Sequence, residues 1–141
     1  MQIGVESSRA VDNKRLFVVD DDEIIRAALQ FMLHDESEAH EVPDVATALA
    51  KSERMQPDVM LLGAGLVRKE GVEVVSLLKS RIPGMKLLLV VDAGDDPLVN
   101  ECRRHGADAV LVKPITVEAV RKQVDRLLGR VSRTVIPIYG V

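Results

Sequence analysis

The sequence predicts an α/β domain in which helices cover both faces of a parallel β-sheet. Short runs rich in Val and Leu alternate along the chain with longer segments whose apolar residues recur at helical spacing. The runs contain no alternation of polar and apolar residues, which is typical of strands buried on both faces of a parallel sheet. A chain of 141 residues is long enough for one such domain with a single hydrophobic core.

Five strands and five helices follow from this rhythm. The apolar runs place strands at about 16–19, 40–42, 59–62, 87–91 and 109–112. Helices are expected at about 24–33, 45–55, 72–78, 97–105 and 117–128. Asp96 followed by Pro97 signals the start of the fourth helix, and Gly106 is expected to terminate it in a left-handed conformation. Thr116 is expected to cap the fifth helix.

Composition argues against several classes of protein. The net charge is −3 and the pI is near 5.6, so the surface has no general basic character and nucleic acid is not an expected partner. No apolar stretch approaches the roughly 20 residues that span a bilayer, and residues 1–10 lack the apolar core of a signal peptide. The single cysteine, Cys102, can form no internal disulfide, which fits a reducing compartment. We therefore expect a cytoplasmic protein with no membrane contact.

Residues that can carry chemistry gather where the expected strands end. They are Asp20, Asp21, Asp22, Gly63, Asp92, Lys113 and Pro114. The carboxyl ends of parallel strands meet at one edge of the sheet, and ligands bind at that edge in folds of this class. An acidic pocket with one lysine suits a magnesium ion and a phosphoryl group. Gly63, however, has no side chain to receive that group.

Three stretches of the chain resemble the receiver domains of bacterial two-component response regulators. They are LFVVDDD at 16–22, PDVMLL at 57–62 and GADAVLVKP at 106–114. The resemblance covers residues 14–130 and implies a flavodoxin-like doubly wound (βα)5 fold, with a five-stranded parallel sheet in the order 2-1-3-4-5. It also implies that Asp20 and Asp21 form the acidic pair of the family, that Gly63 stands at the phosphoacceptor position, and that Lys113 is the family's lysine.

Four residues depart from the pattern that this resemblance implies. Gly63 replaces the acceptor aspartate, although covalent phosphotransfer needs a carboxylate nucleophile there. Asp92 replaces a Thr or Ser that binds the phosphoryl group, and its charge would repel an incoming phosphate. Val110 stands at the switch aromatic position, and Val67 at the position of a loop proline. These departures indicate a pseudo-receiver that is not an enzyme, is not phosphorylated, and acts through protein–protein contacts.

The resemblance also sets expectations for partners and cofactors. The partner should be a protein, namely a histidine kinase, an output domain or another signalling protein. No cofactor is required, and Asp20 and Asp21 retain only part of a Mg²⁺ site, so weak binding is expected. We expect the ammonium group of Lys113 to pair with Asp20, Asp21 or Asp92. Loss of such a partly buried pair in Lys113→Ala would cost about 3–5 kcal/mol.

Other interpretations stay open from the sequence alone. Asp92 is a candidate displaced acceptor in a working phosphorelay receiver. Asp20 and Asp22 have the Asp-x-Asp spacing of small phosphatases that resemble the haloacid dehalogenase group, although the chain has no room for a cap domain. The three aspartates at 20–22 are also suitable caps for the first helix, because negative side chains favour a helix N-terminus. An alternative interpretation of Gly63 is a sharp turn, with the acidic function moved elsewhere in the chain.

The ends of the chain carry less information. Residues 1–13 are expected to be a flexible N-terminal segment, and residues 131–141 a C-terminal tail outside the domain at 14–130. Residues 134–141 are mostly apolar, which favours either a stub of a linker toward an output domain or a peptide that docks on its own domain or a second copy. The fifth helix has a mixed charged surface, and the resemblance supports a homodimer through the fourth and fifth helices.

Overall fold

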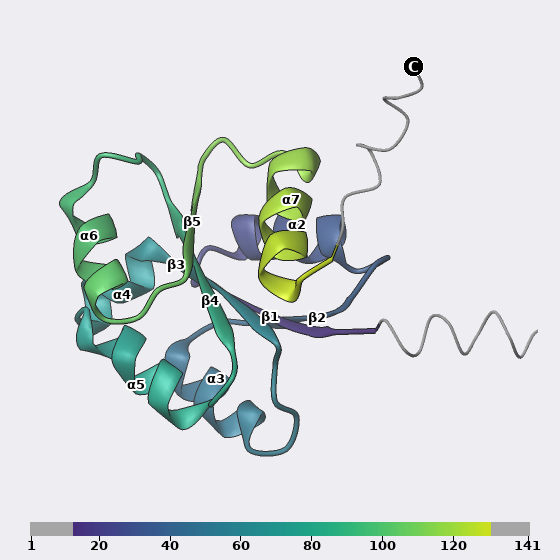
Figure 1. Ribbon diagram of the computed structural model, residues 1–141, viewed down its shortest axis with the longest axis horizontal. Helices are drawn as coiled ribbons and strands as arrows, with labels where there is room; N and C mark the ends of the chain where they lie inside the picture. Colours follow the sequence, from purple (N-terminus) through teal and green to yellow (C-terminus); the bar gives the residue numbers. More distant parts are fainter. Residues whose placement is uncertain (1–12, 131–141) are drawn as a thin grey trace, which may run out of the picture.

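A computed structural model describes residues 13–130, which form three layers with a parallel sheet in the middle (Figure 1). The sheet order is β2-β1-β3-β4-β5, and every neighbouring pair is parallel. The strands are β1 (Arg15–Val19), β2 (Glu38–Val42), β3 (Val59–Gly63), β4 (Lys86–Val91) and β5 (Ala109–Val112). The helices are α2 (Glu23–Leu33), α3 (Val45–Ser52), α4 (Ala64–Glu70), α5 (Glu73–Arg81), α6 (Pro97–Arg104) and α7 (Val117–Leu128). The predicted fold class and strand order are confirmed.

Both faces of the sheet are buried, as the unbroken apolar runs predicted. Successive side chains of a strand point to opposite faces. In β1, Leu16 and Val18 belong to the core beneath α2 and α7, while Phe17 and Val19 belong to the core beneath α3, α4, α5 and α6. Figure 1 shows α2 and α7 together on one side of the sheet and the other helices on the opposite side. The central strand β3 is buried along its whole length.

Helix α4 is an addition to the predicted set of helices. The sequence suggested five helices, whereas the described residues form six, because the segment directly after Gly63 is helical. Seven residues with a glycine among them give little helical periodicity. The helix forms in its tertiary context, where Ala64, Leu66 and Val67 are buried against the core. It ends at Gly71, whose φ of 102° favours glycine.

The predicted helix ends are confirmed. The Asp96 side chain accepts a hydrogen bond of 2.9 Å from the Leu98 backbone N–H, and Pro97 follows it at the start of α6. Gly106, with φ 114°, follows the last turn of that helix. The Thr116 hydroxyl accepts a hydrogen bond of 3.1 Å from the Ala119 backbone N–H and caps α7. Local chemistry therefore places the helices that flank the ends of β4 and β5.

The expectations about the ends of the chain lie outside the described residues. They concern the N-terminal segment, of which residues 1–12 are not described, and the tail at 131–141. Within residues 13–130, no helix combines the length and the apolar character that crossing a membrane requires.

Candidate functional site

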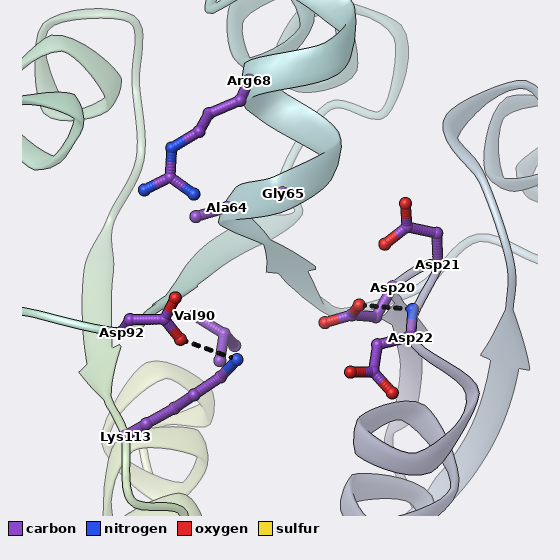
Figure 2. A pocket seen from close by; sticks show the side chains of 9 residues that line it. All are labelled: Asp20, Asp21, Asp22, Ala64, Gly65, Arg68, Val90, Asp92 and Lys113. Carbon is purple, nitrogen blue, oxygen red and sulfur yellow. Dashed lines mark hydrogen bonds and ion pairs between the residues drawn. The ribbon is translucent and has the colours of Figure 1, made fainter.

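A polar cavity opens at the carboxyl edge of the sheet, where the sequence placed it (Figure 2). Its volume is about 170 Å³. The residues that line it come from the ends of β1, β4 and β5 and from α4; they are Asp20, Asp21, Asp22, Ala64, Gly65, Arg68, Val90, Asp92 and Lys113. Topology thus brings together the acidic run, Asp92 and Lys113. Two predicted members, Gly63 and Pro114, do not line the cavity.

The most unusual contact in the site is between Asp20 and Gly63. A Cβ atom added to Gly63 would lie 2.3 Å from Asp20 Oδ2 and 2.7 Å from Asp20 Cγ, closer than real Cβ contacts. Gly63 itself has φ −71° and ψ 135°, which any residue adopts without strain. Gly63 is therefore not a sharp turn, and its backbone does not require glycine. The Asp20 carboxyl group fills the space that a side chain at position 63 would need.

Asp20 is held in this position at the floor of the cavity. Its Oδ1 accepts a hydrogen bond of 2.9 Å from the Asp22 backbone N–H, and the residue is 8% exposed. Burial raises the pKa of the Asp20 carboxyl, and the nearby charge of Asp21 adds to this rise. The Asp22 N–H and the charge of Lys113 oppose the rise without cancelling it. A buried carboxyl group with a raised pKa is a poor replacement for an exposed, ionised metal ligand.

The three aspartates have separate roles. Asp22 caps α2, because its Oδ1 accepts hydrogen bonds from the backbone N–H groups of Ile24 and Ile25 at 3.0 and 3.3 Å. The helix-cap interpretation is therefore correct for Asp22. Asp20 points toward β3, whereas Asp21 Oδ1 lies near Gly65 at the start of α4 (Figure 2).

Lys113 pairs with Asp92 across the mouth of the cavity. Lys113 Nζ lies 3.0 Å from Asp92 Oδ1, and the two side chains are 33% and 74% exposed (Figure 2). Of the three aspartates that the sequence offered as partners, only Asp92 forms an ion pair with Lys113 in the described structure. The expected cost of about 3–5 kcal/mol for Lys113→Ala assumed a partly buried pair. Asp92 is 74% exposed, and exposed pairs contribute about 0–1 kcal/mol, so the structure favours a smaller cost.

Arg68 lines the cavity although sequence reasoning did not select it. Its guanidinium group forms an ion pair with Asp96, the residue that caps α6, and so links α4 to the loop after β4. The Leu98 N–H lowers the pKa of Asp96 most, and Arg68 lowers it further. No pattern in the sequence marks this arginine, because its position depends on α4, a helix that the sequence did not predict.

The remaining predicted residues lie beside the cavity. Val110 is partly buried and packs against the core on the side of α6. Val67 is fully buried in the same core, as part of α4. Pro114 is exposed and follows a cis peptide bond after Lys113. The switch and loop positions that the resemblance implied are thus occupied by small aliphatic side chains.

The residues of the site do not fit a Mg²⁺ ion well. Mg²⁺ binds through oxygen ligands in near-ideal octahedral geometry. Among residues 13–130, no group of three or more His, Cys, Asp or Glu side chains is arranged to hold a metal ion. Asp20 is buried against Gly63, which leaves the exposed Asp21 as the accessible carboxylate of the expected pair.

Comparison with known proteins identifies the family. Residues 16–125 match the response regulator receiver domain. The chain belongs to the response regulator receiver domain family. Relatives of this receiver include the transcriptional regulatory protein LnrK of Bacillus subtilis, 26% identical over 78% of this chain and 51% of the relative. Another is the probable transcriptional regulatory protein TcrX of Mycobacterium tuberculosis, 29% identical over 86% of this chain and 52% of the relative.

Solved structures agree with this assignment. A response regulator receiver domain protein from Methanospirillum hungatei has a TM-score of 0.75 and 26% identity, covering 83% of this receiver and 94% of that chain. The chemotaxis response regulator CheY4 of Vibrio cholerae has a TM-score of 0.73 and 25% identity, covering 82% and 98%. The receiver described here spans about half the length of the transcriptional regulators named above. The activities of those whole proteins therefore do not transfer to it directly.

Proposed function

We propose that this receiver is a signalling module of two-component pathways that works without phosphorylation, by binding a protein partner in one fixed state. Receiver domains are signalling modules that interact with kinases and output domains, so a protein partner follows from the family. The main support for the proposal is the position of the Asp20 carboxyl group, which occupies the space that a side chain at position 63 would need. A side chain at position 63 would meet the Asp20 carboxyl group in its present position, and Gly63 itself offers no nucleophile.

Two ion pairs support the fixed state. Lys113 pairs with Asp92 at the end of β4, and Arg68 pairs with Asp96 at the start of α6. The loop between β4 and α6 is therefore held at both ends by cations from other elements. In this proposal the positive charges that would otherwise meet a phosphoryl group are already paired with carboxylates of the protein. The proposal includes no enzymatic activity and no required cofactor, with at most weak Mg²⁺ binding by Asp20 and Asp21.

The test is the intact mass of the protein after incubation with acetyl phosphate and Mg²⁺. We expect no phosphoryl adduct, while a receiver with an acceptor aspartate, treated in parallel, gains one. An adduct on the wild-type protein would contradict the proposal. Acetyl phosphate and a specific kinase are different phosphoryl donors. The same mass measurement is therefore repeated with a purified cognate kinase as the donor.

A second candidate is a working receiver in which Asp92 is the acceptor. Its favouring observation is the 74% exposure of the Asp92 side chain, with Lys113 Nζ only 3.0 Å away. The Asp92→Asn variant distinguishes the two candidates in the same mass measurement. An adduct that this variant abolishes identifies a displaced acceptor, whereas an adduct that persists in the variant places the phosphoryl group on another residue.

The phosphatase alternative has less support. It requires Asp20 as an accessible nucleophile, and this carboxyl group is 8% exposed, with a raised pKa. The phosphatase alternative would be supported if the wild-type protein hydrolysed a generic phosphomonoester and the Asp20→Asn variant did not.

A further inference from the structure

Helix α2 presents an apolar stripe that no described part of the chain covers. Ile24 and Phe31 are 78% and 72% exposed, whereas the other exposed large apolar side chains of residues 13–130 are only 40–42% exposed. The two residues are seven positions apart, which is two helical turns, so they lie on one face. The exposed Ala27 lies between them. We call Ile24, Ala27 and Phe31 the α2 stripe.

The exposure of Phe31 is unusual for this composition. The chain has two Phe residues and no Trp. Phe17 is completely buried, and Phe31 is left in solvent, with the His34 ring at 5.7 Å as its aromatic neighbour. Burying an exposed aromatic side chain is favourable because it removes a large apolar area from water. A contiguous exposed apolar stripe of this kind indicates a binding surface.

The undescribed C-terminal segment starts beside this helix. The Arg130 guanidinium group donates hydrogen bonds to the Glu36 carbonyl at 3.3 Å and to the Ser37 hydroxyl at 3.5 Å, in the turn after α2. Arg121 of α7 also donates to the Met32 carbonyl at 3.2 Å, so α7 lies along α2. Arg130, the last described residue, therefore lies next to the C-terminal end of α2.

The length and chemistry of residues 131–141 match the α2 stripe. In extended form these residues reach up to about 36 Å, while Ile24 and Glu36 are separated by about 18 Å along a helical rise. The segment contains Val135, Ile136, Ile138 and Tyr139. The acidic residues Asp35 and Glu36 at the near end of the stripe already pair with Arg121, so the match depends on the apolar residues and on length. Pro137 favours an extended peptide, which suits a helix face.

We propose that residues 134–141 bind along the α2 stripe of their own domain and cover Ile24 and Phe31. This contact is separate from the carboxyl-edge cavity and does not depend on the phosphorylation state proposed above. It gives the exposed apolar face of α2 an occupant from the same chain.

Tyrosine fluorescence tests the proposal directly. Tyr139 is the single tyrosine and the chain has no tryptophan, so tyrosine emission reports only on this segment. In the full chain we expect acrylamide to quench Tyr139 more weakly than it quenches N-acetyltyrosinamide. The double variant Ile24→Ser/Phe31→Ser should lose this protection. Leu77→Ser is the matched control, because Leu77 is also exposed but lies on α5 in the opposite layer, and it should keep the protection.

Three outcomes would overturn the proposal. The first is wild-type quenching equal to that of N-acetyltyrosinamide. The second is protection that Ile24→Ser/Phe31→Ser does not change, with circular dichroism showing that the variant is folded. The third is protection that disappears on dilution, which would assign the α2 stripe to the segment of a second copy. Protection that is independent of protein concentration and lost only in the stripe variant supports the proposal.

Discussion

At position 63 the packing of a neighbouring side chain, Asp20, favours glycine, whereas the backbone angles do not require it. The φ and ψ angles of −71° and 135° are ordinary for any residue, so Gly63 provides no conformational freedom that the fold uses. The steric conflict comes from Asp20, whose Oδ2 would lie 2.3 Å from an added Cβ atom. The two positions are therefore coupled, and the coupling can be measured.

We expect Gly63→Ala to destabilise the protein by about 1–3 kcal/mol, the usual cost of overpacking a buried site. In the Asp20→Ala background the same substitution should cost nothing or stabilise by up to about 1 kcal/mol, because Gly→Ala at a compatible backbone reduces the entropy of the unfolded chain. Urea unfolding of the four proteins of this double-mutant cycle gives the coupling free energy.

Gly65→Ala is the control for this cycle. An added Cβ at Gly65 would meet its nearest neighbour, Asp21 Oδ1, at 3.9 Å, which is an ordinary contact. This variant should be as stable as the wild type or more stable, because alanine favours a helix over glycine by about 0.5–1 kcal/mol. Equal effects of Gly63→Ala with and without the Asp20 side chain would contradict the coupling.

The raised pKa of Asp20 predicts a pH effect with a definite sign. The native state binds this proton more tightly than the unfolded chain, so the contribution of Asp20 to stability is complete below pH 3.8 and is lost as the pH rises toward its native pKa. Asp20→Asn mimics the protonated group at every pH. Relative to the wild type, this variant should gain unfolding free energy as the pH rises from about 3.5 to about 7, because only the wild type then carries a buried carboxylate. Parallel urea titrations at several pH values measure the difference; a gap that does not widen with pH would contradict it.

Among the elements, α4 has the largest effect on the site. It carries Arg68 to the cavity and to Asp96, and it buries Val67 where a loop was expected. Together with Lys113, which follows β5, it holds the loop between β4 and α6. The two ion pairs join elements that are distant in sequence, and they constrain this loop without metal or phosphate.

Lys113→Ala tests the energetic weight of one pair. Because Asp92 is 74% exposed, we expect a loss of at most about 1 kcal/mol in unfolding free energy. Lys113→Gln is the matched control, since it removes the charge and retains most of the packing of the side-chain stem. Hydrogen exchange should report faster opening of residues 92–96 in Lys113→Ala. A loss above about 3 kcal/mol would instead indicate the buried pair that the sequence suggested.

For the whole molecule, the open question is which surface makes contacts. The resemblance implies a homodimer through the fourth and fifth predicted helices, which are α6 and α7. We propose that such a dimer would use the face formed by α6, β5 and α7, where Val112 and Val117 are 42% and 41% exposed. Val117→Lys should shift the sedimentation coefficient toward that of a monomer at high protein concentration. Leu77→Lys, on α5 and 40% exposed, should leave it unchanged. A wild-type protein that sediments as a monomer at every concentration would reject this homodimer.

Local patterns were sufficient for most of the fold. The apolar runs gave the five strands, and Asp96, Gly106 and Thr116 gave helix ends that the structure confirms. The location of the site was also predictable, because the carboxyl ends of parallel strands must share one edge. Helix α4 could not be predicted in this way, since a short segment becomes helical only when the core buries its apolar residues.

The sequence by itself determined the family, the sheet and the charged residues at the carboxyl edge except Arg68, because those depend on periodicity and on the order of elements along the chain. Only the tertiary structure decided how these residues meet. In the folded protein the Asp20 carboxyl group lies in the space beside Gly63, Lys113 pairs with Asp92, and Arg68 pairs with Asp96. The physical reason is that such contacts depend on side-chain directions and distances between separate strands and helices, and these arise only when the core packs.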